Sequence, residues 1–196
     1  MIPKLSILLY GNPGTGKSTF AKALAKYLNI HIVRTMTPGY FKSDEDMDNN
    51  RPRRNTRYTG EFINVIDDID CICVSRDEDK SQENLAANSA LLEFLDNPGT
   101  MYYKANDGNF YQIAIVIATT NYYDRLDKAV VRTGRFDCQI EMELFDKELA
   151  EEFCALYNLK LSDVYDGEIG DDFRIQPSSL QAVCLKNIDK SLKEVK

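Results

Sequence analysis

The sequence contains one histidine, no tryptophan and no long apolar run. Because His31 is the single histidine among 196 residues, a histidine-based metal site or a Ser-His-Asp triad has little support. No apolar run approaches the length of a membrane span, and a strand-like run follows Met1 so closely that we expect no signal or transit peptide. These absences predict a cytoplasmic protein with no membrane segment.

Positive charge is also scarce. The 24 Lys and Arg residues are outnumbered by 31 Asp and Glu residues, so the protein as a whole is not a basic nucleic-acid binder, although a local basic patch remains compatible with this balance. The cysteines form no C-x-x-C pair and several stand in apolar runs, which predicts reduced, buried thiols. They are Cys71, Cys73, Cys138, Cys154 and Cys184.

The clearest pattern that is present is glycine-rich. Gly11–Ser18 fits G-x-x-x-x-G-K-[ST], with an apolar strand-like run before it (Lys4–Tyr10) and helical periodicity after it (Thr19–Leu28). Backbone N–H groups of such a loop and the helix N-terminus cradle phosphates. Lys17 brings charge to the outer phosphates, and the Ser18 hydroxyl is placed to ligate Mg²⁺. The flanking strand and helix disfavour the alternative, a plain glycine-rich turn.

Two later apolar runs end in polar side chains. The run Glu61–Asp70 reads as a strand buried on both faces that ends in Asp67 and Asp68, where a carboxylate beside a phosphate-binding loop can hold Mg²⁺. The run Ile113–Asn121 ends in an amide that can orient a water molecule. The amide signal alone is weak, because Asn commonly ends strands for turn reasons.

The remaining segments predict helices and a hairpin. Ser81–Asp96 has an amphipathic helical pattern, and an Asp-Gly turn joins Met101–Ala105 to Phe110–Val116. For the aromatic residues of this hairpin, packing on each other is favoured over a surface that contacts a substrate or a base. These residues are Tyr102, Tyr103, Phe110 and Tyr111. A short helix within Arg125–Asp137 is followed by Arg132 and Arg135. Their spacing fits surface residues and fingers that reach a phosphate in trans equally well.

Together these motifs resemble the AAA ATPases, within the wider AAA+ class. The resemblance lies in YGNPGTGKST (Tyr10–Thr19), VIDDID (Val65–Asp70), NSALLEFLD (Asn88–Asp96) and ATTNYYDRLDKAVVRTGRFD (Ala118–Asp137). The combination of D-I-D with T-T-N-x-x-x-R-L-D is also loosely similar to the motifs of the AAA ATPase branch that assembles mitochondrial respiratory complex III. The resemblance implies an α/β P-loop NTPase fold over residues 1–143, with a five-stranded parallel sheet flanked by helices, and a small helical lid over residues 144–196.

The resemblance also implies ATP and Mg²⁺ as cofactors. Ser18 and Asp67 would handle the metal ion. The phosphates would bind to Gly11, Asn12, Pro13, Gly14, Thr15, Gly16, Lys17, Ser18 and Thr19.

The implied catalytic residues are Lys17 and four others. Asp68 takes the position of the base that polarises the attacking water, and Asn121 that of the sensor that places it. Arg132 and Arg135 would complete the site of a neighbouring subunit, which implies a homo-oligomeric ring, usually of six subunits.

The chain departs from the family pattern at the base and at its start. Asp68 stands where the family usually has Glu, so slow hydrolysis is one expectation. Because the first strand begins almost at Met1, we expect the chain to lack the family's adenine-covering segment and a recognition domain, which leaves its base selectivity and its target open. We expect the recognition part to come from another chain. Tyr40-Phe41-Lys42 falls where the family places an aromatic pore loop, and an ordinary loop aromatic pair is an equal alternative.

The favoured function is a ring-forming ATPase motor or remodeller that acts on a protein substrate. The first alternative is a nucleotide-dependent assembly module that hydrolyses ATP slowly or not at all. The second is a nucleic-acid motor or loader, which is not favoured because a basic run is more often a solvated face. That run contains Arg51, Arg53, Arg54 and Arg57.

Overall fold

The structure is a computed structural model, in which the chain forms two compact units. One unit comprises Met1–Gly11 and Lys17–Glu141, and the other comprises Asn12–Gly16 and Met142–Lys196. The structure describes residues 4–30, 32–36, 41, 62–73, 82–98, 101–104, 110–132 and 134–194. The predictions for His31, Tyr40, Lys42 and the arginine run at 51–57 lie outside these described residues.

The first unit is built on a mixed sheet with five parallel strands. Their order is β2-β3-β5-β1-β6, and β4 adds to β5 in the antiparallel sense. The inner strands are covered on both faces of the sheet, so their sequences are nearly continuous apolar runs. Every residue of β3 is buried. The predicted α/β fold with five parallel strands is therefore confirmed. The strands are β1 (Lys4–Tyr10), β2 (Ile32–Met36), β3 (Phe62–Ile66), β4 (Met101–Lys104), β5 (Phe110–Thr120) and β6 (Cys138–Glu141).

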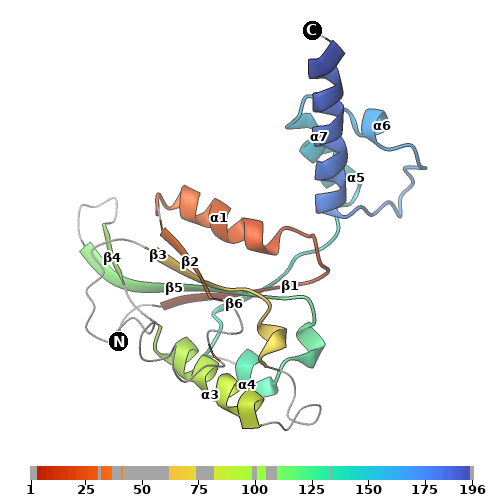
Figure 1. The fold of residues 1–196 in the computed structure, drawn as a ribbon. Coiled ribbons are helices and arrows are strands. Elements are labelled where there is room, and N and C mark those ends of the chain that lie inside the picture. Colours follow the sequence, from red (N-terminus) through yellow and green to blue (C-terminus); the bar gives the residue numbers. More distant parts are fainter. Residues whose placement is uncertain are drawn as a thin grey trace. The chain divides into compact units, whose positions relative to one another are not determined.

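Helices cover both faces of this sheet. Helix α1 (Lys17–Tyr27) lies on one face, and α3 (Gln82–Asp96) and α4 (Lys128–Val131) lie on the other (Figure 1). The core on the α3 side includes Leu8, Ile66, Leu91, Leu95 and Val116. Two short 3-10 helices, η2 (Ile69–Cys71) and η3 (Tyr123–Arg125), follow β3 and β5.

Phe41 belongs to the same core. Its side chain is 3% exposed and its ring meets that of Phe94 edge-on at 6.0 Å between centroids. A buried ring cannot grip a passing chain, so the structure favours a packing role for this residue.

The two arms of the predicted hairpin pair in the antiparallel sense, the predicted Asp-Gly turn lies outside the described residues, and the second arm continues into the core. Strand β5 runs through eleven residues, so one strand contains both the hairpin arm and the buried run that ends at Thr120. Its first part pairs antiparallel with β4, with Tyr103 opposite Tyr111. The packing of the hairpin aromatic side chains stays a prediction.

The second unit has its own helical core. Asp146 caps α5 (Lys147–Ala155) by accepting a hydrogen bond of 2.9 Å from the backbone N–H of Leu149. Helix α6 (Leu161–Val164) had no clear sequence signal, and α7 (Pro177–Glu194) is the longest helix of this unit. These helices bury Ala150, Cys154, Leu161, Phe173, Leu180 and Cys184 together.

The structure buries three of the five cysteines. Cys73, Cys154 and Cys184 are buried, whereas Cys71 and Cys138 are exposed. Burial beside Cys184, whose sulfur is 3.9 Å away, raises the pKa of Cys154 to about 11. The expectation of buried thiols therefore holds for these three and fails for Cys71 and Cys138.

No helix within the described ranges is long and apolar enough to cross a membrane.

Candidate active site

The order of the parallel strands brings three sequence motifs to one edge of the sheet. Strand β5 lies between β3 and β1, with Ala118 paired to Ile66 and Thr120 paired to Tyr10. The residues that follow β3, β5 and β1 therefore emerge side by side at the carboxyl ends of the strands, where ligands bind in α/β sheets. The structure thus brings together Asp67, Asp68, Asn121 and the start of the glycine-rich loop.

One carboxylate oxygen joins α1, β3 and β5. Ser18 Oγ and Thr119 Oγ1 each donate a hydrogen bond of 3.0 Å to Asp67 Oδ1. Thr119 Oγ1 also accepts a bond of 3.1 Å from the Asp68 backbone N–H, so it fixes both acidic residues. A hydroxyl and a carboxylate so close together form a donor set that suits Mg²⁺, which takes one or two carboxylates and completes its shell with phosphate oxygens and water.

Asp68 is held in an unusual backbone conformation beside Asn121. Its φ of 54° and ψ of 53° lie in the left-handed region, which Asp and Asn enter more readily than most residues. Asn121 Nδ2 donates a hydrogen bond of 3.2 Å to Asp68 Oδ1. Desolvation, and then the nearby charges of Asp70 and Asp67, raise the pKa of Asp68. The pair places an oriented carboxylate of increased basicity at the sheet edge.

Asp70 has a role that sequence analysis missed. Its Oδ1 accepts hydrogen bonds from Thr120 Oγ1 at 2.6 Å and from the Asn121 backbone N–H at 3.3 Å. Asp70 therefore ties η2 to the end of β5 and fixes the backbone that carries Asn121. The available signal was the second acidic residue of D-I-D, two positions after Asp68.

Lys17 lies inside the site. Its side chain is buried, and Nζ donates a hydrogen bond of 2.7 Å to the Gly11 carbonyl. Burial lowers the pKa of Lys17, and the carboxylates of Asp68 and Asp70 oppose that shift. The neighbouring acidic residues thus help to keep a buried ammonium charged where the loop leaves β1.

The tip of the loop is held by contacts within the second unit. Gln176 Nε2 donates to the Pro13 carbonyl, and the Ser178 backbone N–H donates to the Gly14 carbonyl at 3.1 Å. Gly14 has a φ of +77°, and a Cβ there would lie 2.4 Å from both Gln176 Nε2 and Ser178 Oγ. Glycine is therefore required at this position by backbone conformation and by space.

The residues present fit ATP with Mg²⁺. Gly11, Gly14 and Gly16 all have positive φ, which lets the loop backbone curl closely around a ligand. Ser18 and Asp67 offer oxygen ligands for the metal ion, and Lys17 offers a positive charge. The expectation derived from the sequence for these residues stays a prediction, and their geometry is compatible with it.

The two arginines that follow α4 have different surroundings. Arg132 is exposed where α4 ends. Arg135 is 7% exposed, and its guanidinium group turns inward to contact the Ala129 carbonyl and Asp96. The finger roles expected of Arg132 and Arg135 stay predictions, because both concern a neighbouring subunit.

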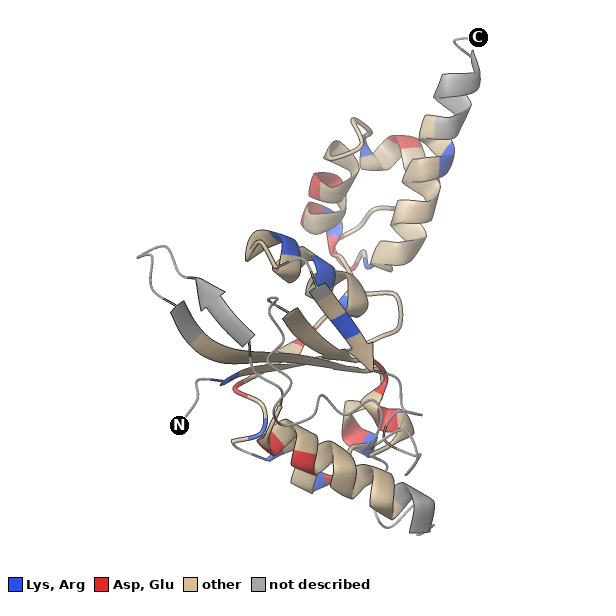
Figure 2. Cartoon of the chain, turned by 60° about the vertical axis from the view of Figure 1, so that its left-hand side comes forward, with Lys and Arg blue, Asp and Glu red and all other residues tan. Residues whose placement is uncertain are grey.

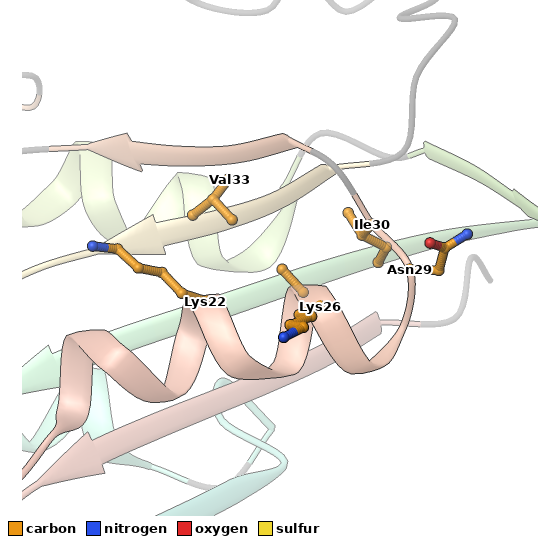
Figure 3. A pocket seen from close by; sticks show the side chains of 6 residues that line it. Lys22, Lys26, Asn29, Ile30 and Val33 are labelled. Carbon is orange, nitrogen blue, oxygen red and sulfur yellow. The ribbon is translucent and has the colours of Figure 1, made fainter. Parts of the chain in front are cut away.

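A separate cavity lies at the other end of α1. It has a volume of about 300 Å³ and contains none of the predicted site residues. In Figure 2 the ribbon of α1 carries the colour of basic residues and none of the colour of acidic ones, and Figure 3 shows the side chains of Lys22 and Lys26 at this cavity. Its lining consists of Lys22, Ala25, Lys26, Asn29, Ile30 and Val33.

Replacing Asp68 by Asn is expected to stabilise the fold slightly at neutral pH. A pKa raised in the folded state means that the charged carboxylate costs stability. The loss of stability is absent at a pH below 3.8, the ordinary pKa of Asp, and reaches its full size at a pH above the raised pKa of the folded state. We expect Asp68→Asn to raise Tm by about 1–2 °C at pH 7 without nucleotide or Mg²⁺, because solvent screens a partly exposed charge.

Thermal unfolding followed by circular dichroism at pH 7 and pH 4.5 measures this effect. The gain in Tm should shrink at the lower pH, and Asp166→Asn, an exposed carboxylate in the second unit, serves as the control. An unchanged or lowered Tm for Asp68→Asn at pH 7 would contradict the assigned cost.

Comparison with known proteins gives consistent matches. The model of the ATPase family associated with various cellular activities (AAA) matches residues 7–144. Over 98% of its length the chain is 29% identical to the Cell division cycle protein 48 homolog of Archaeoglobus fulgidus, of which it covers 26%. Over 80% of its length it is 32% identical to the ATP-dependent zinc metalloprotease FtsH 1 of Alkaliphilus metalliredigens, of which it also covers 26%.

A mitochondrial protein is among the similar sequences. The chain is 28% identical over 98% of its length to the AAA-ATPase ASD, mitochondrial, of Arabidopsis thaliana, and covers 44% of that protein. The chain therefore spans between about a quarter and a half of the length of these three relatives.

Proposed function

Because this chain belongs to the ATPase family associated with various cellular activities, we propose that it binds ATP with Mg²⁺ and hydrolyses it within a ring of like subunits. The observation that carries the proposal is the set of hydrogen bonds at the sheet edge. Ser18 and Thr119 meet on Asp67, and Asn121 holds Asp68 beside them.

Each residue then has a definite task. Bound ATP would supply the phosphoryl group, and Mg²⁺ would neutralise charge on its phosphate oxygens. Lys17 would bind the outer phosphates, and Ser18 with Asp67 would hold the metal ion. Asp68 accepts a proton from the attacking water, and its raised pKa makes it a better base at neutral pH. Asn121 orients that carboxylate through its amide hydrogen bond.

The second half of the site comes from a neighbouring subunit. Arg132, exposed at the end of α4, stabilises the charge that develops on the phosphates bound by the next chain. Hydrolysis then depends on assembly, and nucleotide state is coupled to subunit motion. Residues 144–196 act as a helical lid, and the ring moves or remodels a protein substrate that a partner chain recognises.

A slow nucleotide-dependent assembly module is the second candidate. It is favoured by Asp68, whose side chain is one methylene shorter than the Glu usual in the family, because water positioning is sensitive on that scale. The two candidates differ in the turnover rate of the assembled ring rather than in ATP binding.

ATP turnover measured against protein concentration tests the proposal. If Arg132 acts in trans, turnover per chain should rise several-fold over the concentration range in which light scattering records association. The assembled rate distinguishes a motor from a slow module. Turnover per chain that is the same for the monomer and the oligomer would rule out the shared site.

A further inference from the structure

Asp68 and Asn121 stand on two different turns. Asp68 leads into η2, and Asn121 directly follows β5. One hydrogen bond of 3.2 Å joins their side chains, and Asp68 is exposed. Because water competes for an exposed hydrogen bond, this contact does little to fix the distance between the two turns. The alignment of the two side chains therefore depends on how the backbones that carry them are held.

The turn after β3 rests on the core of the first unit. Ile69, Ile72 and Cys73 are each at most 1% exposed. The Cys73 backbone N–H donates to the Ile69 carbonyl at 2.9 Å, and the Cys73 carbonyl accepts a bond of 3.0 Å from the Asp127 N–H. Asp70, the middle residue of η2, is therefore attached to a backbone that is packed and hydrogen-bonded on both sides.

Asp70 connects this packed backbone to the end of β5. Thr120 is fully buried, and its Oγ1 donates to Asp70 Oδ1 at 2.6 Å, a distance typical of a charge-assisted hydrogen bond. The Asn121 backbone N–H donates to the same oxygen at 3.3 Å. Thr120 Oγ1 also accepts a bond of 3.0 Å from the Tyr122 backbone N–H. One carboxylate and one hydroxyl thus hold the backbone at Asn121 and at the residue that follows it.

We propose that Asp70, together with Thr120, is a positioning residue for ATP hydrolysis, which holds Asn121 in register with Asp68. This inference rests on the proposed function, since it requires Asp68 and Asn121 to act together on the attacking water. It assigns the second acidic residue of D-I-D to the alignment of the base with the amide. A shift of about 1 Å in such an alignment is enough to slow a reaction substantially.

Thr120→Val tests the proposal, because valine suits a buried strand and removes only the hydroxyl. Asp70 is partly exposed, so water can solvate its carboxylate in this variant. We expect kcat to fall about tenfold or more, with KM for ATP and the Mg²⁺ dependence unchanged. Thr120→Ser, which keeps the hydroxyl, should retain most of the activity. Asp124→Asn, which neutralises an exposed carboxylate on η3, is the control and should leave kcat unchanged.

Hydrogen exchange of backbone amides, measured by NMR without nucleotide, gives a readout that is independent of turnover. The amides of Asn121 and Tyr122 should exchange about tenfold faster or more in Thr120→Val, and faster likewise in Asp70→Ala, because their hydrogen bonds are lost or loosened. Thr120→Ser should exchange at the parental rate. Parental exchange rates in both Thr120→Val and Asp70→Ala would show that the pair does not hold this backbone, and would overturn the proposal.

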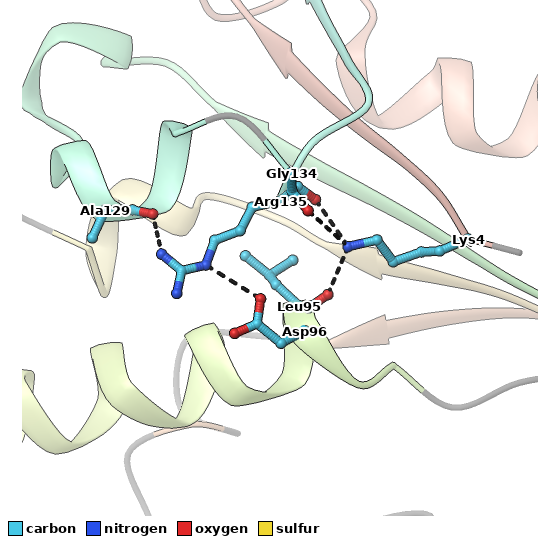
Figure 4. A network of polar contacts seen from close by, with 6 residues as sticks. All are labelled: Lys4, Leu95, Asp96, Ala129, Gly134 and Arg135. Atoms are coloured by element: carbon cyan, nitrogen blue, oxygen red, sulfur yellow. Dashed lines mark hydrogen bonds and ion pairs between the residues drawn. The ribbon is translucent and has the colours of Figure 1, made fainter. Parts of the chain in front are cut away.

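Lys4→Met controls for a general loss of stability. Figure 4 shows Lys4, at the start of β1, with its Nζ at the carbonyls of Leu95, Gly134 and Arg135, at 3.0, 3.5 and 3.3 Å. These contacts lie at the opposite end of β1 from the candidate site, so their loss should lower Tm with little effect on exchange at Asn121. If Lys4→Met accelerates that exchange as strongly as Thr120→Val for the same loss of Tm, the effect is global and the proposal fails.

A double-mutant cycle separates the possible failures. Thr120→Val should have no further effect on kcat in an Asn121→Ala background, because both changes act through one side chain. If Asn121→Ala lowers kcat but Thr120→Val leaves it at the parental value, the inference alone fails. If Asn121→Ala keeps the parental kcat, the role of Asn121 in the proposed function fails, and the positioning role fails with it.

Discussion

Asp68→Asn is expected to abolish ATP turnover while ATP binding is retained. The amide cannot accept the proton of the attacking water, and loss of a positioned base typically lowers a rate by about 10²–10⁴-fold. Binding should persist because the glycine-rich loop, Lys17 and the Ser18–Asp67 contact are unchanged. Asn also tolerates the left-handed backbone at this position, so the fold should not be disturbed.

Phosphate release by the oligomer, with ATP affinity measured in parallel, gives the result for Asp68→Asn. Asp166→Asn should behave as the parent protein. Hydrolysis by Asp68→Asn at the parental rate would exclude Asp68 as the base.

Arg132→Ala should likewise lose turnover, by about 10³-fold or more, as expected for an arginine finger. Arg132 lies beyond α4 and is exposed, so its truncation should alter neither ATP binding nor the hydrogen bonds that hold that helix. The loss should appear in kcat rather than in the affinity for ATP, because the guanidinium acts on charge that develops during the reaction.

Mixing Arg132→Ala with Lys17→Ala provides the decisive control. Each variant alone should be inactive, the first because its finger is missing and the second because its phosphate site is damaged. In a mixed ring, Lys17→Ala subunits supply Arg132 to the intact sites of their neighbours, and turnover should recover in part. Mixed rings that form without any recovery would show that Arg132 does not act in trans.

Sequence patterns were sufficient for the inner strands β1, β3 and β5 and for the residues that follow them at the edge of the sheet. Parallel strands buried on both faces leave continuous apolar runs, and the order of the strands then brings their polar ends together. Strand β6 left no comparable signal, because all four of its residues are exposed. Helix α6 is a single short turn and was equally difficult to recognise.

The different environments of Arg132 and Arg135 could not be read from their spacing. Three positions separate two identical residue types, and the side chain that fixes one of them, Asp96, lies about forty positions earlier in the chain. Phe41 illustrates the same limit, because its burial depends on Phe94 from a distant helix. Burial decided by remote partners leaves no local periodicity.

The backbone at Asp68 also constrains which sequences are accessible to this site by substitution. Among residues other than glycine, Asp and Asn tolerate φ near 54° best, whereas a longer side chain such as Glu incurs a cost of about 1 kcal/mol or more. Exchanging Asp68 for the Glu usual in the family would therefore also favour a rearrangement of the turn between β3 and η2. The length of the base and the shape of its turn are expected to evolve together, so a protein engineer would have to redesign both at once.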